Sequence, residues 1–376
     1  MNRKIVGMIF AFVTVASTVN SASSGRVVRP RAGATVEYLA MQVGQIPRKF
    51  DKSFTGTIGA GLRVRMDLSN DNGTVHGQYF YERIGTAIPL DGKIFPTGSF
   101  ELSELNDEGK PTGHFMGTAA PRSGGAKAQL VLSGTWSSAD GSKNLPFSLS
   151  EEVVDLGPGM DVVSRSIKQD SKKPKYDIDV NYPQITGAGA AGIAGFNREA
   201  EALARKRVAE FKKDASGAGP ASSDSDIGSE LSMSYDVRLG TPDLISVNFG
   251  ISEYSAGAAH PNGFSVTSNY QIKAGRSLAL ADLFLPGKPY LQFISRYSIG
   301  KLKGRLTGGD LEWINRGAGP KLENYKNWNL TSTGLEITFD SYQVAAYAEG
   351  PQLVFIPYSE LKPLINPDGP LAGLVH

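Results

Sequence analysis

The sequence predicts an α+β protein. An N-terminal all-β meander, either a small barrel or a sandwich, is followed by an α+β domain with two helices packed on a mostly antiparallel sheet. Short runs of alternating apolar and polar residues recur through residues 46–155, separated by Gly, Asn and Asp, which is the period of half-buried strands. Two later stretches have helical spacing instead. The chain also contains 44 glycines, many at turn-like places, which favours a β-rich protein.

The N-terminus has the features of a secretory signal. Arg3 and Lys4 give a positive start, the apolar run over residues 5–19 is too short for a comfortable transmembrane span, and small residues follow it. We therefore expect a cleaved signal peptide at residues 1–23, a tether at residues 24–45, and a periplasmic or extracellular protein without a transmembrane segment after cleavage. A retained membrane anchor is the alternative.

The first domain is expected at residues 46–155, because turn signals such as those at residues 70–73 and 91–92 separate its strand-like runs. The aromatic run of Tyr79, Phe80 and Tyr81 indicates a strand that packs on one face and is exposed to solvent on the other. A ligand-binding surface formed by these rings is the alternative. The runs lie at 54–58, 62–68, 75–84, 99–105, 113–117, 130–136 and 145–149.

A linker is predicted at residues 156–175. The segment 157–159 is a Gly-Pro-Gly turn, and residues 168–175 are polar and rich in lysine. The second domain, an α+β domain, is then expected at residues 176–372, with a strand at its start.

Two helices are predicted inside the second domain. Residues 193–215 place apolar side chains on one face at steps of three and four, and a second helix follows Pro286-Gly287 over residues 290–306. The apolar face of the first helix consists of Phe196, Ala200, Leu203, Ala204, Val208 and Phe211.

The run of residues 246–284 is the most informative part of the chain. Alternating strands flank a loop of small residues at 254–263, which holds one of only four histidines. A second patterned block follows at residues 330–361. The positions that carry the pattern are Tyr254, Gly257, His260-Pro261, Asn269-Tyr270, Gly275 and Asp282-Leu283-Phe284, then Leu330, Thr331, Gly334-Leu335, Ile337, Phe339, Tyr342, Tyr347, Gly350, Val354, Ile356-Pro357 and Leu361.

In these two blocks the chain resembles the extracellular domain shared by RsiV-type anti-sigma factors, which sense lysozyme, and PdaC-type peptidoglycan deacetylases. The resemblance covers about residues 174–372, roughly half of the chain, and implies a shared fold. Only some members of this family bind lysozyme, so the resemblance implies a shared fold more strongly than it implies lysozyme binding. The deacetylase chemistry of PdaC-type relatives belongs to a different domain, which uses an Asp and a pair of histidines that this chain does not supply.

Several classes of chemistry have no motif in this sequence. The chain has no cysteine, and none of its four histidines is paired at helical spacing, so we expect no metal site and no cofactor. The nearly neutral net charge of +2 without a basic block argues against a nucleic-acid partner. The pair Glu101 and Glu104 points to opposite faces of a strand, which does not suit a glycosidase.

The candidate site residues are therefore partner-binding rather than catalytic. His260 is expected either to fix its turn through a backbone carbonyl or to lie on a rim that contacts a partner. Trp313 and Trp328 flank a Gly/Pro-rich stretch and are expected either in a binding lip or in the core. The full candidate set is Tyr254, Gly257, His260, Pro261, Asn262, Trp313 and Trp328.

These features favour an exported, non-catalytic binding protein of the cell envelope, whose partner is a lysozyme-like muramidase or peptidoglycan. The alternative is an enzyme, or an enzyme accessory, that acts on cell-wall polysaccharide. Catalytic turnover would distinguish an enzyme from a binding protein, because a binding protein acts stoichiometrically.

Overall fold

The computed structural model describes residues 46–84, 87–106, 108–122, 129–187, 192–217, 228–306 and 310–375. The expected signal peptide at 1–23 and tether at 24–45 lie outside these residues. None of the helices in the described part of the chain has both the length and the apolar composition that a bilayer span requires.

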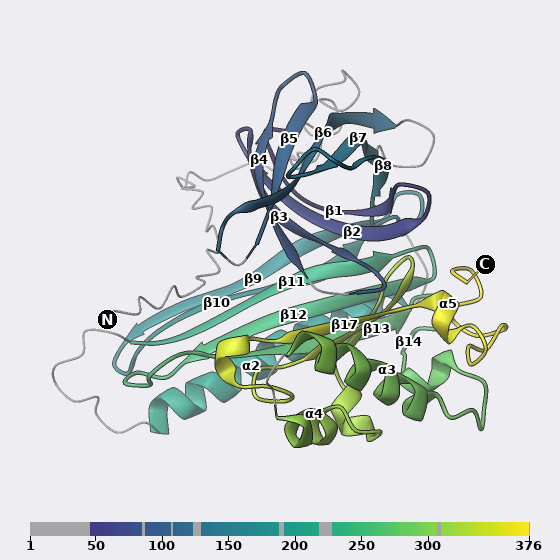
Figure 1. Ribbon diagram of the computed structural model, residues 1–376. Coiled ribbons are helices and arrows are strands. Elements are labelled where there is room, and N and C mark those ends of the chain that lie inside the picture. The colour runs from purple at the N-terminus through teal and green to yellow at the C-terminus, as the bar shows by residue number, and fades with distance from the viewer. Residues whose placement is uncertain are drawn as a thin grey trace.

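The first part of the chain is a closed antiparallel barrel of eight strands (Figure 1). Each strand pairs with the next along the chain, and β1 also pairs with β8, from Phe54 opposite Glu151 to Ile58 opposite Phe147. The barrel therefore has no free edge. The strands are β1 (Lys49–Ile58), β2 (Leu62–Asp71), β3 (Thr74–Tyr81), β4 (Ile88–Ile94), β5 (Ser99–Leu105), β6 (Pro111–Arg122), β7 (Gln129–Ser138) and β8 (Asn144–Glu151).

Apolar side chains fill the barrel interior, as is usual for eight strands. Phe54, Phe115 and Leu149 have no exposed surface, and Tyr79 is only 1% exposed. Of the two architectures that the alternating pattern allowed, the barrel is the one that forms. The aromatic run in β3 is used for packing: Tyr79 points inside, and Phe80 is buried outside the barrel, 6.1 Å between ring centroids from Phe355.

A six-stranded sheet follows, in the order β14-β13-β12-β11-β10-β9. Only β10 and β11 are parallel among its pairs, because the helix α2 (Ile193–Gly217) connects them as a crossover. The predicted apolar face of α2 is buried against this sheet, with Leu203 partly buried. The strands are β9 (Asp161–Lys172), β10 (Lys175–Thr186), β11 (Ser229–Gly240), β12 (Leu244–Tyr254), β13 (Asn262–Gln271) and β14 (Arg276–Ser277).

The predicted linker at residues 156–175 is corrected by this sheet. Most of that segment is β9, which pairs with β10 along its whole length, from Lys172 opposite Lys175 to Asp161 opposite Thr186. Charged residues gave the segment its linker-like composition. They are compatible with an edge strand, where charged side chains discourage pairing with another chain.

The C-terminal part adds a three-stranded antiparallel sheet and short helices around a separate apolar core. The predicted second helix is present as α3 (Tyr290–Arg305), whereas α4 (Leu311–Gly317) and α5 (Tyr358–Leu361) had no clear sequence signal. The remaining elements are β15 (Trp328–Leu330), β16 (Gly334–Phe339), β17 (Gln352–Pro357) and the 3-10 turns η1 (Leu280–Leu283), η2 (Leu322–Tyr325) and η3 (Tyr347–Glu349).

Figure 1 shows the barrel on one side of the six-stranded sheet and the helices on the other. The predicted fold class, an all-β meander followed by helices on a mostly antiparallel sheet, is thus confirmed. The division of the chain into two independently folding domains stays a prediction.

Candidate functional site

The loop singled out in the sequence connects β12 to β13. Tyr254 is the last residue of β12 and half-buried, while Asn262 is the first residue of β13 and exposed. Gly257 lies between them with φ +86°, a left-handed conformation that favours glycine. Ser229 fixes the start of the loop, because its hydroxyl accepts a hydrogen bond of 3.0 Å from the backbone N–H of Ala256.

His260 fixes the end of this loop and is also exposed. Its Nδ1 lies 2.9 Å from the carbonyl oxygen of Pro261, and its ring stacks on Tyr347 with 4.0 Å between centroids. The hydroxyl of Tyr347 donates to the same carbonyl oxygen over 2.9 Å. The expected contact of His260 with a backbone carbonyl is therefore present, and because the ring is also exposed, its contact with a partner stays a prediction.

Two further aromatic residues lie beside this stack. The ring of Tyr342 lies 5.5 Å from that of Tyr347, and Tyr342 is 52% exposed. Trp313 lies on α4, and its Nε1 donates to the carbonyl oxygen of Tyr342 over 2.9 Å. We call the four residues His260, Trp313, Tyr342 and Tyr347 the aromatic ledge.

Tyr342 has a backbone conformation that is unusual for its residue type. Its φ is +67°, and Asn72 is the other non-glycine residue with positive φ among the described residues. For a bulky L-residue this conformation is strained, and strain of this kind concentrates at functional sites. The chain thus holds an exposed tyrosine in an unfavourable conformation, which points to a use for its ring.

The ledge rests on a rigid support. Asp310 caps α4 and accepts hydrogen bonds from the backbone N–H groups of Glu312 and Trp313. The Gln343 side chain donates to the carbonyl oxygens of Gly317 and Asn324, over 2.9 Å each. A Cβ at Gly317 would overlap the carbonyl oxygen of Gln343, so glycine allows the close approach.

Asp340 connects the ledge region to β13. Its carboxylate accepts a hydrogen bond of 2.8 Å from the backbone N–H of Ser265 and one of 2.9 Å from the side chain of Asn327. Burial raises the pKa of Asp340 above its ordinary value, and the hydrogen bond from Ser265 only partly offsets this effect. The carboxylate serves as an acceptor that fixes one sheet to the edge of the other.

The structure brings together some of the predicted site residues and separates others. His260, Pro261 and Trp313 meet at the ledge, although Trp313 is fifty-three positions away from His260 in the chain. Tyr254, Gly257 and Asn262 belong to the same loop. Trp328 is only 5% exposed and packs in the C-terminal core, so core packing is the one of its two expected placements that the structure shows.

Sequence reasoning gave no functional role to Tyr342 and Tyr347. Both were among the patterned positions of the second block, and aromatic residues in a loop were the available signal. The contact of Tyr347 with His260 is a tertiary contact across more than eighty residues, which local spacing does not reveal.

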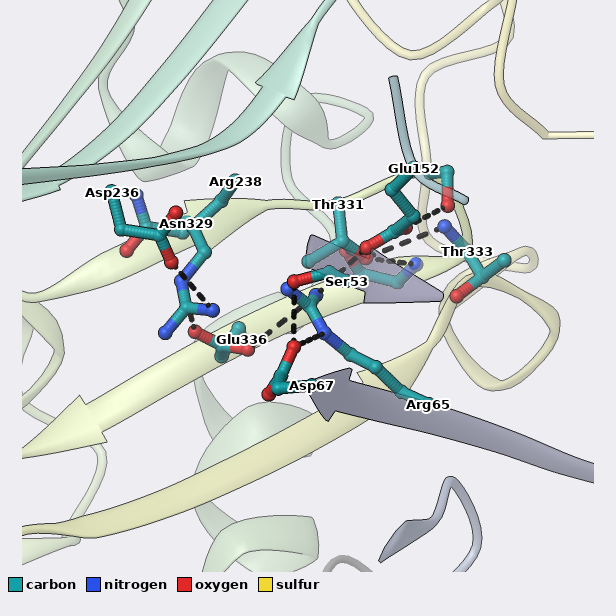
Figure 2. Close-up of polar contacts among 12 residues, drawn as sticks. Ser53, Arg65, Asp67, Glu152, Asp236, Arg238, Asn329, Thr331, Thr333 and Glu336 are labelled. Atoms are coloured by element: carbon teal, nitrogen blue, oxygen red, sulfur yellow. Dashed lines mark hydrogen bonds and ion pairs between the residues drawn. The ribbon is translucent and has the colours of Figure 1, made fainter. Parts of the chain in front are cut away.

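A polar cluster lies where the barrel meets the sheets, and Arg65, Arg238 and Glu336 in it are largely buried (Figure 2). Arg65 of β2 is 2% exposed and faces Asp67, Glu152 and Glu336 at 3.6, 3.5 and 3.8 Å. Arg238 of β11 lies 3.3 Å from Glu336 and 2.9 Å from Asp236. We call these six residues the junction cluster.

Charges in the junction cluster stabilise one another. Burial alone would lower the pKa of the Arg65 guanidinium, but the carboxylates of Glu152, Asp67 and Glu336 raise it above its usual value. Burial raises the pKa of Asp67, yet Arg65 and Arg238 outweigh this and hold it below 3.8. Because each carboxylate of the cluster lies next to an arginine, the arrangement suits a structural clamp rather than acid–base chemistry.

The carboxylates of Glu101 and Glu104 do not share a site. Glu101 is exposed and Glu104 is buried, as the strand period predicted. Glu104 accepts hydrogen bonds from the hydroxyl of Tyr79 over 2.7 Å and from Trp136 Nε1 over 3.0 Å. Within the described ranges, no group of three or more His, Cys, Asp or Glu residues is arranged to hold a metal ion.

Comparisons with known proteins confirm the resemblance predicted from the sequence. Residues 169–263 match the family model described as Deacetylase PdaC, and residues 281–359 match that of a protein of unknown function, DUF3298. Both segments lie after the barrel.

One curated relative is the peptidoglycan-N-acetylmuramic acid deacetylase PdaC of Bacillus subtilis, which is 28% identical over 138 residues. The match covers 36% of this chain and 29% of PdaC, so the chain spans less than a third of that relative.

Two solved structures of the DUF3298 family are also similar. The protein from Bacteroides fragilis has a TM-score of 0.46 and 17% identity, and the match covers 58% of this chain and 98% of that chain. The protein from Pseudomonas aeruginosa has a TM-score of 0.44 and 15% identity, and the match covers 57% of this chain and 97% of that chain.

Proposed function

We propose that this protein is an exported, non-catalytic binding protein of the cell envelope, and that the aromatic ledge binds the glycan strands of peptidoglycan. The observation that carries the proposal is the ledge itself, which brings together aromatic residues from three separate segments. The rings of His260, Tyr347 and Tyr342 lie in series, Trp313 bonds the carbonyl oxygen of Tyr342, and the backbone of Tyr342 is strained. Rigid aromatic side chains supply a large contact area at a low cost in conformational entropy. Their faces suit the apolar face of a sugar ring, while the hydroxyl and N–H groups bind its polar rim.

The relative PdaC supports the choice of ligand. As its name states, PdaC is a deacetylase of the N-acetylmuramic acid of peptidoglycan. Only 29% of PdaC is matched, so the deacetylase activity itself is not part of the proposal. The part of PdaC that this chain shares is compatible with a domain that binds the same polymer, peptidoglycan.

Sedimentation with purified peptidoglycan tests the proposal. Wild-type protein should pellet with the polymer, and Tyr342→Ala or Tyr347→Ala should weaken binding at least tenfold, since an aromatic anchor at a hot spot contributes about 2 kcal/mol or more. Phe95→Ala is the matched control, because Phe95 is a 40% exposed aromatic residue on the barrel. Equal binding by the wild type and both tyrosine variants, with all proteins folded by circular dichroism, would remove the ledge from the proposal.

Two further assays distinguish the alternatives. If the protein is an enzyme acting on wall polysaccharide, acetate or reducing ends should accumulate with time when it is incubated with peptidoglycan. If its partner is a lysozyme-like muramidase, calorimetry with hen lysozyme as the probe should give stoichiometric binding and the muramidase should lose activity. Neither signal is expected when the ledge binds glycan alone.

A further inference from the structure

We infer that a small polar hollow at the edge of β13 is a second sugar-binding subsite, and that a glycan strand runs along this edge from the aromatic ledge to the hollow. The inference rests on the proposed function and extends it to a defined path on the surface. The hollow has a volume of about 280 Å³ and lies between α2, the β13 edge and the segment before β15. Its polar lining includes Glu199, Thr267, Ser268, Ser277 and Lys326, with Trp328 as an apolar wall.

The edge of β13 joins the two sites. The short strand β14 pairs with β13 only at Tyr270 and Gln271, so the earlier part of β13 is bordered on that side by residues 326–347. Tyr347 bonds Pro261 at one end, Asp340 bonds Ser265 in the middle, and the backbone N–H of Trp328 donates to the hydroxyl of Thr267 at the other end. One continuous segment therefore supports both the ledge and the hollow.

The separation of the two sites suits a polymer rather than a small molecule. Pro261 at the ledge and Ser268 in the hollow are seven residues apart on an extended strand, which spans about 23 Å at about 3.3 Å per residue. Several linked sugar rings cover such a length, whereas a single ring does not. The two sites can therefore hold different rings of one strand.

The chemistry of the hollow favours a single sugar ring. Three hydroxyl groups, a carboxylate and an ammonium group line it, and burying these against an apolar ligand would leave polar groups without partners. The Glu199 carboxylate already accepts a hydrogen bond from the Ser277 hydroxyl, which orients both groups on the wall. Lys326, from the segment before β15, can donate to a carboxylate or amide oxygen, and Glu199, from α2, can accept from a hydroxyl or amine, so an amino sugar matches both groups.

The two sites are fixed relative to each other, and this has a measurable consequence. Asn327, next to Lys326, donates to Asp340, and its carbonyl oxygen accepts from the backbone N–H of Thr338. When two contacts on one rigid support bind the same strand, the second contact forms at a high effective concentration. Affinity should therefore rise steeply with oligosaccharide length until the strand reaches both sites.

The three tryptophans of the chain provide a separate reporter for each region. Trp313 belongs to the ledge, Trp328 to the hollow and Trp136 to the barrel. We would label the indole nitrogens of the full-length protein, assign them by Trp→Phe variants, and titrate with β-1,4-linked N-acetylglucosamine oligomers from the monosaccharide to the hexasaccharide. The hexasaccharide should shift the Trp313 and Trp328 signals and leave Trp136 unchanged.

Two variants test the hollow directly. Ser268→Leu fills it and should weaken hexasaccharide binding at least tenfold while the Trp313 signal still moves. Ser232→Leu, at an exposed position of β11, is the matched control. Lys326→Ala with Lys321→Ala as control repeats the test without adding volume, in case the filled variant does not fold.

The outcomes separate this inference from the proposed function. If Trp313 moves, Trp328 stays unchanged at saturation, and both hollow variants bind like wild type, the inference is wrong and the ledge remains the binding site. If peptidoglycan does not bind the protein at all, the proposed function fails. The inference then fails with it unless the monosaccharide alone shifts Trp328.

Discussion

Replacement of Arg65 by methionine is the sharpest test of how the barrel is held to the rest of the molecule. Methionine keeps most of the side-chain volume and removes only the charge and its donors. Arg65 is 2% exposed and lies 3.5–3.8 Å from carboxylates of three different segments, namely Asp67, Glu152 and Glu336. The substitution leaves these carboxylates buried with fewer positive neighbours.

The expected loss of stability follows from the burial of these charged groups. Breaking a buried ion pair by removing one partner typically costs about 3–5 kcal/mol, because an uncompensated buried charge remains. Glu336 keeps Arg238 at 3.3 Å, which limits the loss at that carboxylate. We therefore expect Arg65→Met to lower the free energy of unfolding by about 3–4 kcal/mol, towards the lower end of that range.

The assay is urea denaturation at neutral pH, followed by circular dichroism and by tryptophan fluorescence. Lys49→Met is the control, because Lys49 pairs with Asp71 at 2.9 Å while both side chains are about 60% exposed. An exposed pair contributes at most about 1 kcal/mol. If Arg65→Met and Lys49→Met unfold with the same free energy as wild type, the junction cluster does not stabilise the fold and our argument from burial is refuted.

Three further predictions follow from the site and the junction. Tyr342→Gly should be about 1 kcal/mol more stable than Tyr342→Ala, because the backbone φ of +67° at this position suits glycine. Both variants should lose glycan binding. Equal unfolding midpoints of the two variants would show that the backbone at residue 342 is not strained. Gly317→Ala should lower the melting temperature and shift the Trp313 fluorescence, since a Cβ overlaps the Gln343 carbonyl; an unchanged spectrum would contradict the close approach. The pKa of Asp67 is lowered in the folded protein, so the stability difference between wild type and Asp67→Asn should be largest above about pH 4 and should shrink as the pH falls further. A difference that grows on acidification would contradict this sign.

Local sequence patterns determined much of the fold. The alternation of apolar and polar residues located the strands of the barrel, because side chains of a strand point alternately to its two faces. The turn at residues 70–73 was visible as an Asn-Gly pair, and the structure gives Asn72 and Gly73 the positive φ values of 55° and 99° that such a hairpin turn requires. The helix α2 was equally clear, since its apolar residues recur at the helical period.

The tertiary structure alone decided which segments pair and which side chains meet. The segment with a linker-like composition forms the edge strand β9, because it pairs with β10 along twelve residues. Local composition does not show which strand a segment will pair with. Likewise, Trp313, Tyr342 and Tyr347 lie near His260 only because the folded chain brings their separate segments together. Short-range periodicity is fixed by backbone geometry, so the sequence displays it directly. Contacts between distant residues depend on how whole elements bury their apolar faces together, and only the folded chain shows where that brings two side chains into contact.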